Sequence, residues 1–468
     1  MRPPITIVGA GLVGALLATL LAQRGFAVTV FERRPDPRKA GFLGGRSINL
    51  ALAERGWHGL RVAGMQERMR PIAVMMRGRM VHDVNGQTNL QRYGRDDSEV
   101  IWSVNRGALN TNLLDAAEAA GTIIHFDQRL DSVDWNHSIL HLRSEDGTVR
   151  EHRAGVVLGT DGAGSALRNA MARVVDLGER FEPLGHGYKE LEIPALTDIP
   201  QASLAPGLHE KRARGERFAM EPNALHIWPR GNYMCIALPN AEGSFTVTLF
   251  LPNEGTPSLS SVKTASDARA FFERDFADIV PLMPGLEADY VGNPTGLLGT
   301  LYLDRWHLDH RALLLGDASH AIVPFHGQGM NAGFEDAVEL AELIAATPDD
   351  TASVFAEFER RRKPNADAIA AMALENYVEM RDRVDDADYL LMRELDRALA
   401  ARHPGRWAPR YWMVTFSRIP YRTAFERGAI QSKLLRELIA GKSTLADINL
   451  DAADARVRLI LSPVPADT

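Results

Sequence analysis

The sequence contains one cysteine, Cys235, among 468 residues. A single cysteine excludes an internal disulfide and excludes a metal site built from several thiolates. Proteins that work in an oxidising compartment usually carry more cysteines, because disulfides stabilise them there. We therefore expect a cytoplasmic protein.

Long apolar runs are also scarce. Residues 5–22 carry no charge, but glycines at positions 9, 11 and 14 interrupt this run where a membrane helix would carry leucine. No small-residue cleavage motif follows it, and the segment after Gly441 has only short apolar patches. We therefore expect residues 5–22 to be folded core and expect no membrane anchor.

Neither sign of charge dominates. Lys and Arg number 53 against 60 Asp and Glu, a formal net charge of −7, which argues against nucleic acid or an anionic membrane as the main partner. Hydrophobic residues make up 45% and charged residues 24%, as in globular proteins. The length predicts two or three units that share an interface. A small-molecule ligand is the expected partner.

A glycine-rich turn separates two apolar runs near the start of the chain. Residues 5–8 read as a strand, Gly9-Ala10-Gly11-Leu12-Val13-Gly14 as a turn, and the leucines that follow as a helix. The next run, residues 27–31, ends at Glu32, 18 residues after Gly14. This pattern is typical of a βαβ dinucleotide site, where bare backbone approaches a pyrophosphate and the acid accepts from a ribose hydroxyl. NAD and FAD share the half that this motif binds, so both remain open.

Two later apolar runs each end in an aspartate. Residues 156–159 precede Asp161, and residues 312–315 precede Asp317. An acid at the carboxyl end of a parallel strand lies where an open sheet binds ligands. Each aspartate could equally cap the helix that follows it. The sequence leaves both interpretations open.

The middle and end of the chain have different patterns. Residues 224–228, 233–238 and 245–251 read as an antiparallel meander, because turn-forming segments separate the three runs. From Ser353 onward the apolar residues recur at helical spacing. The sequence shows no internal repeat and no flexible linker, so we expect the units to pack tightly.

Three elements are similar to those of the class A flavoprotein monooxygenases built like p-hydroxybenzoate hydroxylase. They are the βαβ motif at residues 5–32, the segment at Asp161 and the segment at Asp317. Four blocks narrow the resemblance to the kynurenine 3-monooxygenase family, and it spans residues 5 to about 420. The blocks are GRSINLAL at 45–52, YGRDDSE at 93–99, VPFHGQGMN at 323–331 and LENYVEM at 374–380. Eukaryotic members carry a C-terminal membrane anchor, which this sequence does not display.

The resemblance implies an α/β fold: a Rossmann-type FAD-binding domain, an inserted antiparallel β-sheet substrate domain and a C-terminal helical unit. The implied boundaries are residues 1–72, 100–180 and 285–345 for the FAD-binding domain, 73–99 and 181–284 for the substrate domain, and 346–468 for the helical unit. No second GxGxxG follows a strand, so we expect no separate nicotinamide domain. The resemblance implies that NADPH docks transiently on the protein surface. Nothing in the sequence specifies an oligomeric state.

The implied activity is hydroxylation of L-kynurenine to 3-hydroxy-L-kynurenine with NADPH and O2, through a C4a-hydroperoxide of the flavin. Another FAD reaction on the same scaffold is an alternative, although the Trp-x-Trp-x-Ile-Pro element of flavin halogenases is missing. A flavin-binding sensor without turnover is a third reading. NADPH consumption that rises on adding kynurenine would separate the hydroxylase from the sensor.

By this resemblance thirteen residues hold the cofactor. They are Gly9, Gly11, Gly14, Glu32, Arg33, Arg46, Ala51, Arg106, Leu130, Asp317, Gly329, Met330 and Asn331. Arg33 would lie by the adenine, Arg106 by the pyrophosphate and Asp317 by a ribityl hydroxyl. The last three would begin a helix whose free N–H groups favour anionic reduced flavin by about 0.3–1 kcal/mol. Ordinary packing is the alternative role for Ala51 and Leu130.

The substrate clamp implied by the resemblance consists of Arg79, Tyr93, Asn376 and Tyr411. A planar guanidinium with phenol donors suits the carboxylate of an amino-acid substrate. Phe325 and His326 would lie between the substrate ring and the flavin and would shape the pocket, while the flavin carries the chemistry. Without the resemblance, Arg79 reads as a solvated charge and Tyr411 as an aromatic at the edge of the core.

Overall fold

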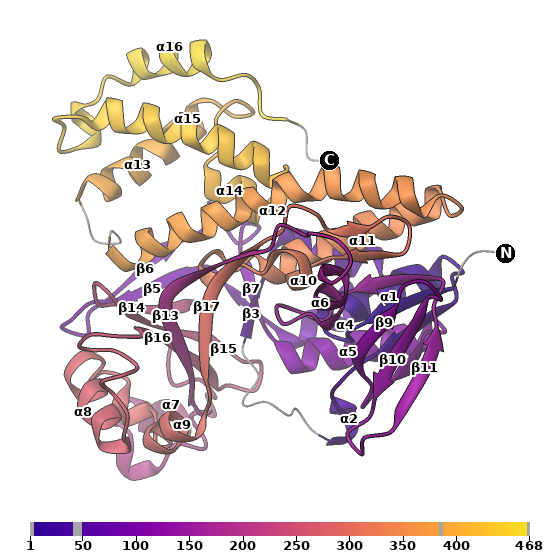
Figure 1. Ribbon diagram of the computed structural model, residues 1–468. Helices are drawn as coiled ribbons and strands as arrows, with labels where there is room; N and C mark the ends of the chain where they lie inside the picture. The colour runs from indigo at the N-terminus through magenta and orange to yellow at the C-terminus, as the bar shows by residue number, and fades with distance from the viewer. Residues whose placement is uncertain (1–3, 41–48, 383–386, 466–468) are drawn as a thin grey trace.

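The computed structural model describes residues 4–40, 49–382 and 387–465, and its two β-sheet regions lie side by side under a layer of C-terminal helices (Figure 1). A six-stranded sheet forms the centre of one region, in the order β18-β19-β12-β1-β2-β8. Its strands are β1 (Ile5–Val8), β2 (Val28–Phe31), β8 (Ile123–His125), β12 (Val156–Gly159), β18 (His307–Leu308) and β19 (Ala312–Leu314). All neighbouring pairs are parallel except β18 with β19. The predicted strand-turn-helix order is therefore confirmed.

Helices cover this parallel sheet because their sequences are apolar where they touch it. In α1 (Leu12–Gln23) nine of twelve residues are buried, so the helix is core on nearly every side. The other helices of the region are α2 (Pro37–Ala40), α3 (Glu54–Val62), α4 (Gln66–Met69), α5 (Arg106–Ala119), α6 (Ala166–Ala172), α10 (Asp317–His320) and α11 (Gly329–Ala346). The uncharged run at residues 5–22 is thus folded core, as expected.

Two small sheets flank the parallel one. The first has the order β11-β10-β9, and the second has the order β3-β7-β4. Their strands are β9 (Arg129–Asp134), β10 (Ile139–Arg143), β11 (Val149–Arg153), β3 (Asn49–Leu52), β7 (Ile101–Asn105) and β4 (Ala73–Met76). The second sheet leads directly into the other region, because β4 is followed by β5 of the large sheet.

The large sheet has seven strands in the order β17-β13-β16-β15-β14-β5-β6. They are β5 (Gly78–His82), β6 (Thr88–Arg92), β13 (Arg180–Ile193), β14 (Leu225–Pro229), β15 (Met234–Pro239), β16 (Phe245–Pro252) and β17 (Thr295–Tyr302). The predicted meander corresponds to β14, β15 and β16 and is confirmed. The sequence did not reveal the parallel pairing of β5 with β14, in which Arg79 lies opposite Leu225. Helices α7 (Pro206–Ala213), α8 (Ala265–Asp275) and α9 (Leu286–Gly292) lie at the lower end of this region (Figure 1).

The C-terminal helices span both regions. They are α12 (Thr351–Asp382), α13 (Ala387–Arg402), α14 (Arg410–Thr415), α15 (Tyr421–Ile439) and α16 (Leu450–Ile460). Five short 3-10 helices complete the described elements: η1 (Arg70–Ile72), η2 (Gln201–Ser203), η3 (Val280–Leu282), η4 (Pro324–His326) and η5 (Leu445–Asp447). In Figure 1, α12 runs across the top of both sheets, so residues on its lower face can meet segments from each.

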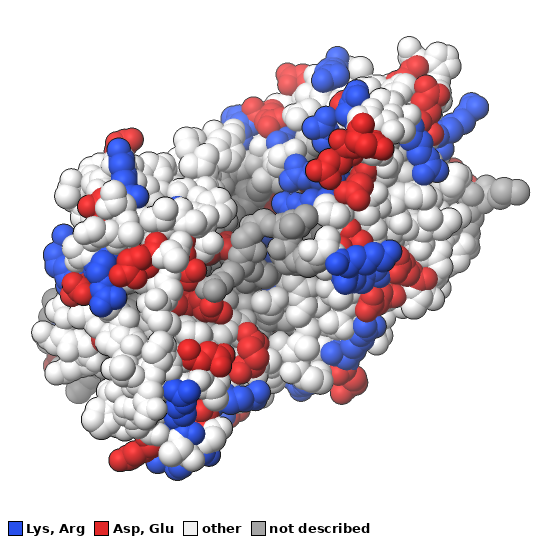
Figure 2. All heavy atoms as spheres, turned by 90° about the horizontal axis from the view of Figure 1, so that it is seen from below, with Lys and Arg blue, Asp and Glu red and all other residues white. Residues whose placement is uncertain are grey.

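The surface carries both signs of charge. In the view from below, acidic and basic side chains are interspersed over both lobes (Figure 2). Among the residues that the structure describes, no helix combines the length and the apolar character needed to cross a membrane.

Candidate functional site

The glycine turn after β1 is held by tight backbone contacts. Gly9 has a φ of +102°, and a Cβ there would lie 2.7 Å from the carbonyl oxygen of Thr160. A Cβ on Gly14 would lie 2.1 Å from the carbonyl oxygen of Gly9. A Cβ on Gly11 would meet no atom within 4 Å. Gly9 and Gly14 are therefore required by the fold, whereas Gly11 borders open space that a ligand can enter.

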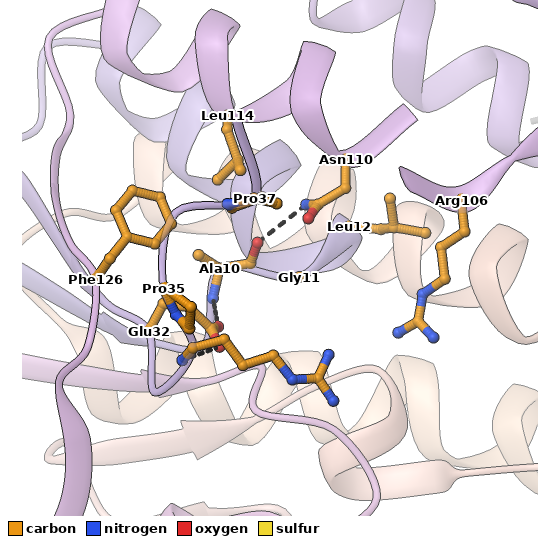
Figure 3. Close-up of a pocket in the computed structure, with 11 residues that line it drawn as sticks. Ala10, Gly11, Leu12, Glu32, Pro35, Pro37, Arg106, Asn110, Leu114 and Phe126 are labelled. Carbon is orange, nitrogen blue, oxygen red and sulfur yellow. Dashed lines mark hydrogen bonds between the residues drawn. The ribbon is translucent and has the colours of Figure 1, made fainter. Parts of the chain in front are cut away.

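Glu32 is fixed at the end of β2 by two backbone donors. The amide of Ala10 donates to one carboxylate oxygen at 2.8 Å, and the amide of Arg34 donates to the other at 3.0 Å. The side chain of Asn110 donates to the carbonyl of Ala10 at 3.0 Å and so holds the turn from its other side (Figure 3). Each oxygen of Glu32 keeps a further lone pair for a ligand hydroxyl.

A cavity of about 60 Å³ lies beside this turn. Its walls include the predicted residues Gly11, Glu32 and Arg106. They also include Arg34, which the sequence analysis did not single out. Two further wall residues that it did not single out, Asn110 and Phe126, are labelled in Figure 3. Two guanidinium groups and an aromatic ring suit a phosphorylated nucleotide. Arg33 is exposed and is not among the wall residues, so its adenine contact stays a prediction.

The two aspartates that follow β12 and β19 have different environments. Asp161 accepts hydrogen bonds from the Ser165 hydroxyl at 2.5 Å and from the amides of Ala166 and Leu167 at 2.7 and 3.1 Å. These bonds make it a cap of α6. Asp317 is exposed, and no residue in the described ranges donates a hydrogen bond to it. Of the two acids, Asp317 is the one available to a ligand.

The start of α11 lies next to Asp317. A Cβ built on Gly329 would be 3.9 Å from a carboxylate oxygen of Asp317. The side chain of Asn331 accepts from the amide of Ala53 at 2.9 Å and donates to the carbonyls of Ala51 and Gly327, both at 2.8 Å. These bonds tie the end of β3 to the first turn of α11. The first N–H groups of any helix have no partner within it, so they remain for a ligand.

Three further residues were predicted to contact the cofactor: Met330, Leu130 and Arg46. Met330 is partly buried against the main hydrophobic core. Leu130 is 5% exposed, pairs with Leu142 across β9 and β10, and belongs to that same core, so a cofactor contact stays a prediction. Arg46 lies outside the residues that the structure describes.

A buried cation lies at the end of the large sheet nearest to α12 and α14. Arg79 on β5 is only 9% exposed, and its guanidinium carbon lies 5.8 Å from the ring centres of both Tyr93 and Tyr411. The two rings stack on each other at 5.4 Å. The structure therefore brings together three of the four predicted clamp residues, which come from β5, the segment after β6, and α14.

Burial alone would lower the pKa of the Arg79 guanidinium, but the neighbouring Tyr93, Tyr411 and Glu379 outweigh it. The pKa of Arg79 is therefore raised, and the group stays charged. Burial also raises the pKa values of both phenols above their ordinary value, although the charge of Arg79 opposes this. The tyrosines consequently remain neutral hydrogen-bond donors.

Asn376, the fourth predicted residue, contacts η4, the 3-10 helix that carries Phe325. Its amide nitrogen donates to the carbonyl of Phe325 at 2.5 Å and contacts the sulfur of Met380 at 3.3 Å. This amide therefore holds η4 in place. Whether it also contacts substrate stays a prediction.

Phe325 and His326 extend the aromatic cluster around Arg79, which begins with Tyr93 and Tyr411. The ring of Phe325 lies 4.4 Å from Tyr377 and 5.0 Å from Phe250, two residues that the sequence analysis did not select. The ring of His326 stacks on Tyr411 at 5.6 Å. Burial lowers the pKa of His326 to about 4, and the charge of Arg79 adds to this effect. His326 is therefore a neutral imidazole at neutral pH.

The fold and the nucleotide cavity define a class of protein. Residues 2–182 and 297–373 match the family model described as FAD binding domain. Two oxygenase structures share the fold. One is 2-methyl-3-hydroxypyridine-5-carboxylic acid oxygenase, with a TM-score of 0.61 at 18% identity over 83% of this chain and 95% of that chain. The other is Pseudomonas aeruginosa PqsL in complex with 2-aminobenzoylacetate, with a TM-score of 0.62 at 22% identity over 82% and 98%. The chain has the fold of the FAD-binding monooxygenases.

Closer relatives narrow the class. The kynurenine 3-monooxygenase of Xanthomonas axonopodis pv. citri (strain 306) is 56% identical over 98% of this chain and 97% of the relative. That of Stenotrophomonas maltophilia (strain K279a) is 52% identical over 97% and 96%. The chain belongs to the kynurenine 3-monooxygenase family.

Proposed function

We propose that the protein hydroxylates L-kynurenine on the ring carbon beside the amine, giving 3-hydroxy-L-kynurenine. One oxygen atom of O2 enters the ring and the other leaves as water, while NADPH supplies the two electrons and is oxidised to NADP⁺. The observation that supports this most directly is the buried cation Arg79. In the described part of the chain no carboxylate forms an ion pair with it, so a substrate carboxylate would supply the missing counter-charge.

The residues present fit an FAD molecule. Gly11 leaves room for a pyrophosphate, Arg34 and Arg106 supply positive charge beside it, and Glu32 has lone pairs for a ribose hydroxyl. Asp317 and the first N–H groups of α11 would hold the ribityl chain and the pyrimidine edge. These residues span both ends of an extended dinucleotide.

When bound and reduced, FAD supplies the activation of O2 for transfer of one oxygen atom to an aromatic ring. The chain contributes binding and orientation. Arg79 would grip the carboxylate, and the phenols of Tyr93 and Tyr411 would donate hydrogen bonds to it. The substrate ring would then rest against Phe325 and His326, and the aromatic side chains packed around them would exclude water from it.

Proton abstraction by the protein is a minor part of this proposal. An imidazole whose pKa is about 4 is a weak base at neutral pH, so His326 shapes the pocket instead. The ring amine of kynurenine itself donates electrons to the carbon that is hydroxylated.

The division into an FAD domain, a substrate domain and a helical unit is part of the proposal, as are transient NADPH docking and a cytoplasmic location.

The test is NADPH oxidation by the purified flavoprotein. We expect slow oxidation without kynurenine and a strong increase when it is added, together with a product of the mass of 3-hydroxykynurenine. An equal rate with and without kynurenine would contradict the proposal. A different product would favour another FAD reaction on the same scaffold.

A further inference from the structure

Tyr421 connects the C-terminal helices to the start of α11. It is the first residue of α15 and is fully buried. Its hydroxyl donates to the side-chain oxygen of Gln328 at 2.7 Å, across 93 positions of sequence. Gln328 is the N-cap residue of α11 and is itself 2% exposed. A hydroxyl from the C-terminal unit therefore fixes the residue from which the helix begins.

The ring of Tyr421 is fixed as well. The guanidinium carbon of Arg55 on α3 lies 3.9 Å from the centre of the ring. The same guanidinium pairs with Glu335 on α11 and donates to the carbonyl of Ile419, two residues before Tyr421. Because Arg55 is fully buried and joined to both helices, Tyr421 has little freedom to move away from Gln328.

The next turn of α11 is also bonded to a C-terminal helix, α12. Arg362 on α12 pairs with Glu335 and Asp336, both at 2.7 Å. Asp336 also bonds to His320 at 2.6 Å and accepts from the amide of Gly316 at 3.1 Å. Gly316 immediately precedes Asp317. The C-terminal helices thus anchor both elements that would touch the flavin, with Tyr421 acting on the start of α11.

We propose that Tyr421 is a positioning residue for the flavin: by fixing Gln328, it orients the N–H groups at the start of α11 toward the pyrimidine edge. The inference rests on the proposed function, because it requires FAD at that place. A helix N-terminus stabilises negative charge most when its N–H groups point at the charge. Reduced flavin carries that charge, so a misoriented helix start weakens binding of the reduced form more than binding of the oxidised form.

The test is the two-electron midpoint potential of the FAD holoenzyme carrying Tyr421→Phe. The substitution keeps the ring beneath Arg55 and removes only the hydroxyl. We expect the affinity for reduced FAD, relative to oxidised FAD, to fall threefold to tenfold, which lowers the midpoint potential by roughly 15–30 mV. A change in the visible flavin spectrum should accompany the shift.

Tyr290→Phe is the matched control. The Tyr290 hydroxyl is also buried and donates to the carbonyl of Val262 at 3.0 Å, but α9 lies in the other region, away from α11. Both variants lose one buried hydroxyl bond, so similar losses of thermal stability are expected. Only Tyr421→Phe should change the potential.

Gln328→Met removes the acceptor and leaves Tyr421 in place, so it keeps the test open if the first variant folds poorly. It should lower the potential in the same direction. Adding Tyr421→Phe to Gln328→Met should cause no further shift, because the two residues act as one unit.

A potential in Tyr421→Phe that matches wild type, or equal shifts in Tyr421→Phe and Tyr290→Phe, would overturn the inference. Failure of the proposed function is distinguishable, since it would appear in the wild-type protein as absent FAD or absent hydroxylated product.

Discussion

The cavity beside the glycine turn and the aromatic cluster around Arg79 differ in how far apart in sequence their residues are. Around the cavity, Gly11, Glu32 and Arg34 come from one short βαβ segment, and backbone amides hold the carboxylate in place. In the aromatic cluster, Arg79 and Tyr411 are more than three hundred positions apart and meet only when α14 packs against the large sheet.

The electrostatics of the two places differ as well. The charges beside the cavity are exposed or half-buried, so water stabilises them without a ligand. Arg79 is buried between two neutral phenols, and in the described part of the chain no carboxylate forms an ion pair with it. We conclude that removing one cavity group should weaken FAD binding modestly, whereas removing Arg79 should strongly reduce binding of a carboxylate substrate.

Arg79→Met should have the largest effect. It removes a charge-assisted contact of about 1.5–3 kcal/mol, so kynurenine affinity should fall at least tenfold while FAD remains bound. Titration of the flavin spectrum with kynurenine measures this affinity. Arg77→Met is the matched control, because Arg77 pairs with the exposed Asp97 at 3.0 Å and should leave the affinity unchanged. An unchanged affinity in Arg79→Met would show that the clamp is assigned wrongly.

Gly11→Ala should affect the cavity alone. Its φ of −68° suits alanine and its Cβ would meet no protein atom, so the apoprotein should keep its thermal stability. The methyl group would occupy space next to the pyrophosphate, and FAD affinity should fall by roughly tenfold, about 1.4 kcal/mol. Isothermal titration of apoprotein with FAD measures the loss. Gly207→Ala, also with nothing near its Cβ, should bind FAD like wild type; equal affinities in all three proteins would argue against a pyrophosphate beside Gly11.

Asp317→Ala and Asp161→Ala should give opposite results. Loss of the Asp161 cap should cost about 1 kcal/mol of unfolding free energy. Loss of Asp317 should leave the stability of the apoprotein unchanged and should weaken FAD binding by roughly 0.5–1.5 kcal/mol. Denaturant unfolding and FAD titration separate the two effects. If Asp317→Ala stays fully yellow after dialysis, Asp317 does not hold the ribityl chain.

A pH-dependent effect on stability is expected at Glu190 on β13. Burial raises the pKa of this carboxyl to about 7, and the charge of Arg106 partly opposes the rise. The folded state therefore binds more protons than the unfolded state between the ordinary value of 4.5 and about 7, so its contribution to stability decreases as pH rises through that window. Glu190→Gln should remove this decrease in thermal unfolding measured from pH 4.5 to 7. If stability fell equally with pH in wild type and in Glu190→Gln, the raised pKa would not belong to Glu190.

The part of the site that the sequence predicts is the part whose residues are close together in it. The turn at Gly9 to Gly14 and the acid at Glu32 follow from local spacing, because a tight turn and the end of a strand have local requirements. Asn110 gave no such indication, since its bond to Ala10 spans 100 positions. Asp161 and Asp317 look alike in sequence, and only the neighbouring donors distinguish a helix cap from a free carboxylate.

The aromatic cluster around Arg79 could be anticipated only through family resemblance. Spacing carries no information about which distant strands and helices pack together, so Tyr93 and Tyr411 had no local reason to be paired with Arg79. Phe250 and Tyr377, whose rings contact the ring of Phe325, were missed for the same reason. The bond between Tyr421 and Gln328 likewise depends on how α15 docks onto α11.

Turnover of kynurenine under isotopically labelled O2 shows whether the protein inserts oxygen from O2 into the ring. Purified holoenzyme with NADPH should yield 3-hydroxykynurenine that carries one heavy oxygen atom in its new hydroxyl group, and Arg79→Met should yield far less at the same kynurenine concentration. A product whose hydroxyl oxygen comes from water, or consumption of NADPH with no hydroxylated product, would contradict the account.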